Sequence, residues 1–326
     1  MTAAGPEVSV VIPTKSRWHT LAVTLPGALG QEGVRHEVIV VDDGSTDETA
    51  RRLSELRDPR LRVIRHERSR HLVAARNSGI AAARGRWLAF LDDDDLWSPR
   101  KLRALLDAAE ARGAVFAYSA GLVIDSDRSV LQTWPAPAPD GLLATLLRGN
   151  WIPAGGSNPI ARTDLVRRLG GFDERLRHFG EWDMWIRLAA AGPAAACAEP
   201  LVAYLSHAEN MVLHDSRAVV RESLRFVGKH RRCSARYGAR PAEVVPDRMG
   251  FLRWLGWAHA RAGRPIRASG WYLGAAIGSS PYGRRKSLRD ARAALLGQIP
   301  ADRPTPVDPA AVRAASWLTD HPHASA

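Results

Sequence analysis

The stretch Trp87-Leu-Ala-Phe-Leu-Asp-Asp-Asp-Asp-Leu-Trp97 joins an apolar run directly to four carboxylates. A run of this length and character predicts a buried strand that ends where the acids begin. In open α/β sheets, ligands bind at the carboxyl ends of the strands, which is where Asp92 to Asp95 would lie. Adjacent carboxylates repel one another unless a cation compensates them, and oxygen ligands suit Mg²⁺ or Mn²⁺. The alternative is a solvated acidic turn in which Asp95 caps the next helix.

The composition of the 326 residues is that of a globular protein. No apolar run is long enough to span a bilayer and no signal-peptide pattern starts the chain, so a cytoplasmic location is expected. The two cysteines, Cys197 and Cys233, offer neither a disulfide framework nor a metal-binding spacing. The net charge of +12 favours anionic partners, but a genome rich in G and C also explains an excess of arginine. Because no nucleic-acid-binding motif is present, we expect no nucleic-acid partner.

Strands and helices alternate over residues 8–112. Buried strands are predicted over 8–12, 37–41, 61–64 and 87–91, and helices over 18–28, 45–57, 71–83 and 99–112. This spacing predicts an α/β fold with a mostly parallel central sheet and helices on both faces. Asp42 and Asp43 follow the second strand, so they would share a sheet edge with Asp92–Asp95. No glycine-rich dinucleotide motif and no P-loop follows the first strand.

Local signals refine these elements and extend them along the chain. Ser45 and Glu48 form a capping box that predicts the start of the second helix. Further short strands are predicted over 115–118 and 122–124, and residues 132–158 are rich in loops. A helix is then predicted over 162–169, another over 179–188 and a late strand over 202–207.

From about residue 215 the pattern changes to helices separated by Gly, Pro and Ser. These helices are predicted over 216–236, 247–262, 264–278 and 285–297. We therefore predict a catalytic domain over 1–215, with halves 7–125 and 126–215, followed by a helical region over 216–300. The tail over 301–326, rich in Ala, Pro and His, is predicted to be flexible.

Six short motifs occur in series: Val8–Thr14, Val41–Asp47, Ala75–Ile80, Phe90–Asp95, Gly170–Asp173 and Glu181–Trp185. In this order and spacing they resemble the family 2 glycosyltransferases of the GT-A fold. The resemblance covers roughly residues 7–215 and implies a Rossmann-like nucleotide-binding half and an acceptor half. It also implies a hexosyltransferase that moves a sugar from a nucleoside-diphosphate sugar to an acceptor hydroxyl with inversion.

The resemblance implies a role for the acids after the fourth strand. Asp92 and Asp94 are similar to the outer acids of the family's D-x-D element, which hold Mn²⁺ or Mg²⁺ on the diphosphate. Asp94 would be the direct metal ligand, and Asp92 would contact the ribose or share the metal. Asp93 would reach hydroxyls of the donor sugar, and Asp95 would cap the following helix. A cation held there would stabilise the charge that develops on the leaving group.

The resemblance places the nucleotide along the same edge. Pro13 and Thr14 follow the first strand, where the family binds the nucleoside. Asp43 resembles the acid that accepts a hydrogen bond from the base, with Asp42 as the alternative. Arg76 resembles an arginine near the base and phosphates, work that suits a planar, permanently charged group. The other interpretation of Arg76 is a surface helix arginine.

An inverting transfer needs a base to take the proton of the acceptor hydroxyl. The family supplies a carboxylate at the start of a late helix, before a Trp-Asp-x-Trp sequence. Glu181 occupies that position here, although the usual acid pair is reduced to one and an Asp is replaced by Glu. Asp183 is the second candidate, and its other interpretation is a charge that supports the helix dipole.

Several further side chains are candidates with a structural alternative. His207 follows the late strand, where some relatives place a histidine that binds the metal or the diphosphate, and His214 is a weaker candidate. Trp151, Trp182 and Trp185 could stack on sugar faces. Trp182 and Trp185 could equally belong to the core, because they lie three residues apart on one helix face.

The acceptor is not identified by the sequence, and neither are the sugar, the base of the nucleotide and the oligomeric state. The basic helices over 216–300 could contact the inner face of an anionic membrane, form a dimer, or pack on the catalytic domain. Two other functions compete with glycosyl transfer. One is a nucleotidyltransferase, which is disfavoured because no lysine-containing glycine-rich loop follows the first strand. The other is a non-catalytic module that binds sugar nucleotides or a membrane surface.

Overall fold

The computed structural model describes residues 5–207, 216–238, 248–261, 263–277, 279, 281–298 and 307–320. The chain forms two compact units. Unit 1 consists of Met1–Leu146, Asn150–Leu205 and Pro306–Ala326, and unit 2 of Leu147–Gly149 and Ser206–Thr305. The boundary therefore falls ten residues before the predicted one, and the C-terminal segment belongs to unit 1.

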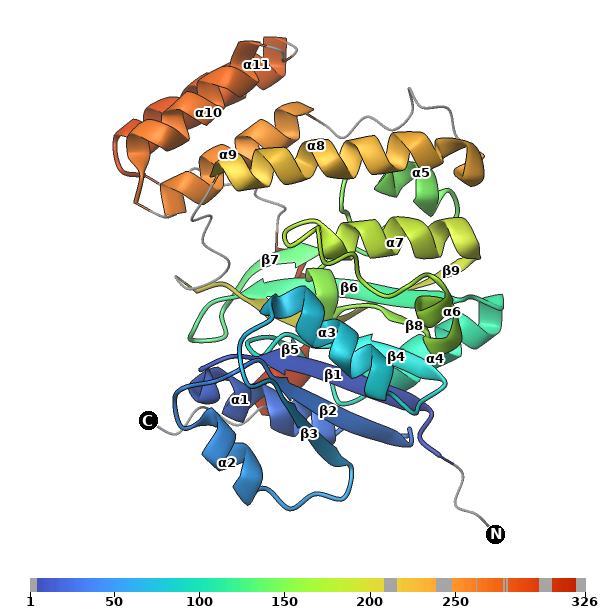
Figure 1. The fold of residues 1–326 in the computed structure, drawn as a ribbon. Coiled ribbons are helices and arrows are strands. Elements are labelled where there is room, and N and C mark those ends of the chain that lie inside the picture. Colours follow the sequence, from blue (N-terminus) through green and yellow to red (C-terminus); the bar gives the residue numbers. More distant parts are fainter. Residues whose placement is uncertain are drawn as a thin grey trace. The chain divides into compact units, whose positions relative to one another are not determined.

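A mixed sheet forms the centre of unit 1 (Figure 1). Within the described residues it has nine strands in the order β3-β2-β1-β4-β8-β6-β9-β5, with β7 paired to β6. The first four strands are parallel, as the alternating pattern predicted: β1 Val8–Thr14, β2 His36–Asp42, β3 Leu61–Arg65 and β4 Trp87–Phe90. This half confirms the predicted α/β fold.

The second half of the sheet is less regular. The short strand β8 (Ile160–Arg162) runs antiparallel to both β4 and β6 (Phe116–Ile124). Strand β9 (Ala194–Leu205) is parallel to β6. Two short strands complete the sheet: β5 (Leu96–Trp97), antiparallel to β9, and β7 (Val130–Trp134), antiparallel to β6. The two strands predicted over 115–118 and 122–124 are therefore one continuous strand.

Helices cover both faces of the sheet because alternate side chains of β1 point to opposite sides. Val8, Val10 and Ile12 pack into one core with leucines of α1 (Trp18–Leu29) and α4 (Lys101–Arg112). On the other face, α3 (His71–Ala82) comes so close to β1 that a Cβ at Gly79 would collide with Val11. The remaining helices of this unit are α2 Thr49–Glu55, α5 Leu142–Leu146, α6 Thr163–Arg168, α7 Gly180–Ala191 and α12 Pro309–Ala314.

Two predicted helix caps are wrong. Helix α2 begins at Thr49, and the Ser45 hydroxyl accepts a hydrogen bond from the Ser16 backbone instead of capping the helix. Asp95 is followed by strand β5 and not by a helix, since α4 begins only at Lys101. In both cases a long-range partner in the sheet edge replaces the local bond that the sequence suggested.

Residues 307–320 do not form the flexible tail that the composition of residues 301–326 predicted. Helix α12 is followed by a 3₁₀ turn over Ser316–Asp320. Trp317 and Leu318 are buried with Leu96 and Leu122, and the indole of Trp317 donates to the Pro200 carbonyl at 3.1 Å. Two large apolar side chains among small and polar neighbours are enough to dock this segment, because docking removes their surface from water.

Unit 2 is helical, as predicted. It contains α8 Ser216–Cys233, α9 Arg248–Arg261, α10 Pro265–Ile277 and α11 Pro281–Leu295, with a 3₁₀ turn over Ser234–Tyr237. Helices α9, α10 and α11 share a small core in which Ala268 and Tyr272 of α10 meet Ala291 and Ala294 of α11. Among the residues that the structure describes, no helix is long and apolar enough to cross a membrane.

We predict that Trp317→Ala lowers the free energy of unfolding of unit 1 by about 3 kcal/mol, because it empties a buried indole site and removes a hydrogen bond. Urea denaturation followed by circular dichroism measures the change. Arg313→Ala, at an exposed position of α12, is the control and should change stability by less than about 0.5 kcal/mol. Equal stability of wild type and Trp317→Ala would show that the segment is not docked.

Candidate active site

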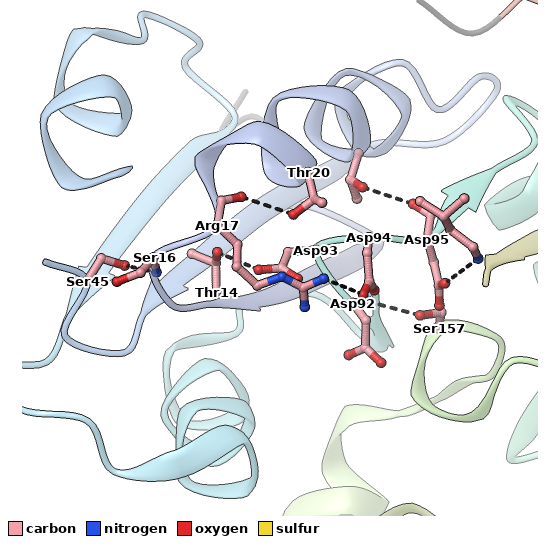
Figure 2. Close-up of polar contacts among 12 residues, drawn as sticks. Thr14, Ser16, Arg17, Thr20, Ser45, Asp92, Asp93, Asp94, Asp95 and Ser157 are labelled. Carbon is pink, nitrogen blue, oxygen red and sulfur yellow. Dashed lines mark hydrogen bonds and ion pairs between the residues drawn. The ribbon is translucent and has the colours of Figure 1, made fainter. Parts of the chain in front are cut away.

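The ends of β1, β2 and β4 bring both acidic clusters together, as the sequence predicted. Strand β1 lies between the other two and is parallel to both. The Asp43 backbone donates to the Thr14 carbonyl at 2.8 Å, and the Thr14 hydroxyl donates to Asp93 Oδ2 at 2.6 Å (Figure 2). Thr14 is thus the link between the loop after β2 and the loop after β4, and Pro13 precedes it in β1.

The carboxylate of Asp43 is already fully used within the protein. It accepts hydrogen bonds from His66 Nδ1 and Ser69 Oγ and from the backbone of Arg70 and His71, at 2.6–3.0 Å. Burial would raise the pKa of Asp43, but these hydrogen bonds outweigh it and lower the pKa. Four hydrogen bonds fill the acceptor capacity of a carboxylate, so Asp43 holds the loop before α3 and has no acceptor site left for a ligand.

Asp42 differs from Asp43 in keeping one oxygen without a hydrogen bond. Its Oδ1 accepts from the Ser45 backbone at 2.8 Å. Its Oδ2 is buried, finds no hydrogen-bond partner in the described residues, and lies 3.5 Å from Arg65 Nε. Of the two acids that the sequence proposed for the nucleotide base, Asp42 therefore has the spare acceptor.

The acids after β4 form a tight and largely buried turn. The Asp95 backbone donates to the Asp92 carbonyl at 3.2 Å, and Asp95 Oδ1 accepts from the Leu205 backbone. Burial raises the pKa of Asp92, and it raises the pKa of Asp93 to about 7. Burial and the neighbouring acids also raise the pKa of Asp95 well above its usual value. Burial is thus the main reason that the charged forms of these acids are disfavoured, and the neighbouring carboxylates add to it.

Arg17 pairs with two of these acids and was not anticipated from the sequence. Its guanidinium lies 3.0 Å from Asp93 Oδ1 and 2.7 Å from Asp94 Oδ2 (Figure 2). Arg17 immediately precedes α1, three residues after the end of β1. A single arginine after a strand carries no local signal, and only the parallel pairing of β1 and β4 brings it over the acids.

Arg76 connects the acidic turn to the start of α7. It is 1% exposed, and its two terminal nitrogens lie 2.5 Å from Asp92 Oδ1 and 2.6 Å from Glu181 Oε1. The ring of Phe172 packs below the guanidinium, with its centroid 5.6 Å from Cζ. The interpretation of Arg76 as a surface arginine is therefore wrong. Burial opposes its charge, but Asp92 and Glu181 outweigh burial and raise the pKa of Arg76.

Glu181 and Asp183 lie on different sides of α7. Glu181 is partly exposed and faces Arg76, next to Gly155 and Gly156, where an added Cβ would collide with Glu181 and Arg76 respectively. Asp183 is fully buried and 2.7 Å from Arg187 Nη2. Arg187 also donates to the carbonyls of residues 169 and 171, so Asp183 stabilises that turn. The geometry places Glu181 alone beside the acidic turn.

A buried polar network fixes the loop that carries these glycines. Ser157 Oγ accepts from the Asp92 backbone at 3.0 Å, and its carbonyl accepts from the Trp97 indole at 2.7 Å. The next residue, Asn158, exchanges two hydrogen bonds with the Ser119 backbone and accepts one from Lys101 Nζ. Lys101 also lies over the Trp97 ring, 4.6 Å from its centroid. Residues 132–158 carry no local sequence signal for this network, because their partners are distant in the chain.

The tryptophans and histidines that the sequence offered as candidates differ in where the structure places them. Trp185 is fully buried and packs edge-on against Phe172, so it belongs to the core and not to a sugar-binding surface. Trp182 donates to the Leu146 carbonyl at 2.6 Å, and Trp151 is 44% exposed. His207 follows β9 and belongs to unit 2, so its role stays a prediction, and His214 lies outside the described residues.

The donor set of the acidic turn fits a hard divalent cation. Within the described residues, no three acidic, histidine or cysteine side chains converge as a ready-made metal centre. However, burial, together with the neighbouring carboxylates, raises the pKa of Asp92, Asp93 and Asp95 despite the pairing with Arg17 and Arg76, and a divalent cation beside them would oppose this rise. Carboxylate oxygens are the ligands that Mg²⁺ and Mn²⁺ prefer.

The fold and these residues agree with a known protein family. Residues 9–160 match the family described as glycosyl transferase family 2. The matched region, residues 9–160, is thus that of a family 2 glycosyltransferase. The succinoglycan biosynthesis protein ExoO of Rhizobium meliloti is 35% identical over 212 residues, which are 62% of this chain and 61% of ExoO. The Escherichia coli UDP-Glc:α-D-GlcNAc-diphosphoundecaprenol β-1,3-glucosyltransferase WfgD is 30% identical over 40% of this chain and 51% of WfgD.

Solved glycosyltransferase structures share the fold of this chain. Residues 1–349 of S. aureus TarS superpose with a TM-score of 0.56 at 16% identity, covering 97% of this chain and 88% of that one. The mannosyltransferase PcManGT of Pyrobaculum calidifontis, in complex with GDP-Man and Mn²⁺, gives a TM-score of 0.54 at 18% identity over 90% and 86% of the two chains. The chain thus spans most of these structures, but about half to three fifths of the length of ExoO and WfgD.

The buried Lys101 leads to a prediction about pH and stability. Burial lowers the pKa of Lys101 from 10.5 to about 7, so between these values the unfolded chain binds a proton that the folded chain does not. Stability conferred by Lys101 is therefore lowest below pH 7 and rises toward pH 10.5. We predict that the free energy of unfolding of wild type, minus that of Lys101→Met, increases with pH across this window.

Chemical denaturation at several pH values measures this difference. Arg103→Met, in the same helix, is the control, because a guanidinium stays charged throughout and its removal should give a difference independent of pH. If the difference for Lys101→Met were equally flat, Lys101 would keep its proton in the folded state.

Proposed function

We propose that this chain transfers a sugar from a nucleoside-diphosphate sugar to an acceptor hydroxyl, with inversion at the anomeric carbon. The observation that carries this proposal is the Arg76 bridge, which holds Asp92 and Glu181 on one guanidinium. In the proposed reaction, one carboxylate helps to hold the cation on the departing diphosphate, and a separate carboxylate takes the proton of the incoming hydroxyl. The two terminal nitrogens of Arg76 thus contact one candidate for each task, Asp92 and Glu181.

Glu181 is the proposed base. Its carboxylate is partly exposed, so an acceptor hydroxyl can reach it, and the ion pair with Arg76 holds it beside the acidic turn. The glycines at positions 155 and 156 leave no side chain between this carboxylate and the acidic turn. Asp183 is proposed as a structural acid, because its partner Arg187 donates a hydrogen bond to the Leu169 carbonyl in the turn after α6.

The acidic turn is the proposed site of the divalent cation and the diphosphate. Asp92 and Asp94 would hold Mn²⁺ or Mg²⁺, which would stabilise the charge of the leaving diphosphate. Asp93 is held by Thr14 and Arg17, and is proposed to face the donor. Asp42, with its spare buried oxygen, is proposed to meet the nucleotide at the adjacent loop. The Mn²⁺ complex of PcManGT and the nucleotide donor named for WfgD support this assignment.

The acceptor is proposed to be a glycan intermediate linked to a lipid. The name of WfgD specifies an acceptor attached to diphosphoundecaprenol, and ExoO acts in the synthesis of succinoglycan. A screen of nucleotide sugars by thermal shift with Mn²⁺ present would identify the donor. If no nucleotide or nucleotide sugar raised the melting temperature, the proposed function would lose its support.

We predict that Glu181→Gln lowers kcat for sugar transfer about 10²–10⁴-fold, because the amide cannot take a proton but can still accept a hydrogen bond from Arg76. Donor affinity, measured by calorimetry, should change little. Asp183→Asn is the matched control: it should lower the free energy of unfolding through its lost ion pair with Arg187 while kcat falls less than about tenfold. The reverse ranking of the two kcat values would assign the base to Asp183.

We also predict that Arg17→Ala binds Mn²⁺ alone about tenfold more tightly than wild type does. The guanidinium compensates Asp93 and Asp94, so its removal leaves more negative charge for an added cation. Titration of Mn²⁺ followed by electron paramagnetic resonance measures free ion without any turnover. Arg65→Ala, which removes an arginine beside Asp42, is the control. Unchanged or weaker binding by Arg17→Ala would exclude competition between Arg17 and the cation.

A further inference from the structure

The helical segment 248–298 concentrates the charge of the whole chain. It contains ten arginine and lysine residues against one acidic residue, so it supplies nine of the net charges in a total of +12. The acidic residue, Asp290, is buried and lies 3.3 Å from Arg289 of its own helix. None of this charge is used by the catalytic residues proposed above. The excess therefore points to an anionic partner outside the active site.

The same segment exposes large aliphatic side chains in a regular pattern. On α10, Ile266, Leu273 and Ile277 share one face at helical spacing, and the two isoleucines are 80% and 82% exposed. The opposite face of α10, which includes Ala268 and Tyr272, is buried in the small core with α11. Side chains of this size on one stripe form an exposed apolar face that has no partner among the described residues.

Helix α11 presents the same combination of groups. Its exposed side chains include Leu288, Leu295 and the following Leu296, together with Arg285 and Arg292. Leucine and arginine thus alternate along one side at intervals of three and four residues, while Ser287, Ala291 and Ala294 are buried on the other side. Figure 1 shows α10 and α11 lying side by side as a pair.

We propose that the α10–α11 pair docks on the surface of a membrane that contains anionic phospholipids. Exposed aliphatic side chains can enter the boundary between headgroups and acyl chains, while arginines at the same level bind the phosphates. The long arginine side chains allow both contacts at once, because their apolar stems can lie along the acyl region. Docking needs neither a donor nor an acceptor, so this inference is independent of the proposed sugar transfer.

Charge and side-chain type disfavour the other occupants of this surface. A second copy of the chain would bring together two segments that each carry an excess of nine positive charges. Nucleic acid would match the charge, but exposed aromatic side chains are what stack on bases, and among the side chains of this segment that the structure describes, the large apolar ones that are exposed are isoleucine and leucine. An anionic lipid surface satisfies the charged and the aliphatic groups together.

Flotation of the full chain with vesicles tests the proposal. Wild type should float with vesicles of phosphatidylglycerol and phosphatidylcholine at low salt, and should not float with phosphatidylcholine alone. The double variant Ile266→Ser/Ile277→Ser should lower the partition coefficient about tenfold, since it removes the two most exposed aliphatic side chains. The double variant Arg285→Glu/Arg292→Glu should abolish flotation at low salt.

Leu56→Ser/Arg57→Glu is the matched control, because it makes the same chemical changes at an exposed site that follows α2 and should leave flotation unchanged. All variants should keep the thermal unfolding profile and the donor affinity of wild type. No flotation of wild type with anionic vesicles at low salt would overturn the proposal. It would also be overturned if Ile266→Ser/Ile277→Ser converted a dimer to a monomer in analytical ultracentrifugation while flotation stayed unchanged.

Discussion

The buried guanidinium of Arg76 is the constraint on which the site depends. A permanent charge that is 1% exposed must be paired. Its two partners come from different parts of the chain: Asp92 lies 16 residues after Arg76, and Glu181 lies 105 residues after it. Loss of either carboxylate would remove one of the two ion pairs that compensate this buried charge. The end of β4 and the start of α7 are therefore held at a fixed separation by one side chain, and α3 supplies that side chain from the face of the sheet.

The surroundings of this bridge are shaped to preserve it. Gly155 lies against the Glu181 carboxylate and Gly156 against the Arg76 guanidinium, and the ring of Phe172 packs on the guanidinium. Asn77, next to Arg76 in sequence, exchanges hydrogen bonds with the backbone of Phe172 and so fixes that ring. The glycine loop, the Phe172 ring and the two ion pairs thus surround Arg76 together. The carboxylates of Asp92 and Glu181 stay partly exposed to solvent, whereas the guanidinium of Arg76 is buried.

The regular half of the fold could be predicted because its signals are local. Runs of β-branched residues identify buried strands, and parallel strands place the loops that carry Asp42 and Asp92 on one edge. Arg17, Ser157 and Lys101 escaped prediction because each acts through a partner more than fifty residues away. The same reason explains the wrong cap assigned to Asp95, whose carboxylate accepts from the backbone at the end of β9. The docking of Trp317 likewise depends on β5, β6 and β9.

The sequence by itself determined the family, the α/β order of elements and the identity of the candidate acids, since these follow from motifs and periodicity along the chain. It also determined that the helices after residue 248 are strongly basic. The tertiary structure decided which acids are still available: Asp43 is saturated, Asp183 is buried, and Glu181 faces Arg76. It also decided which aliphatic side chains of α10 and α11 are exposed. Hydrogen-bond capacity and burial depend on what surrounds a side chain, and those neighbours come from distant parts of the chain.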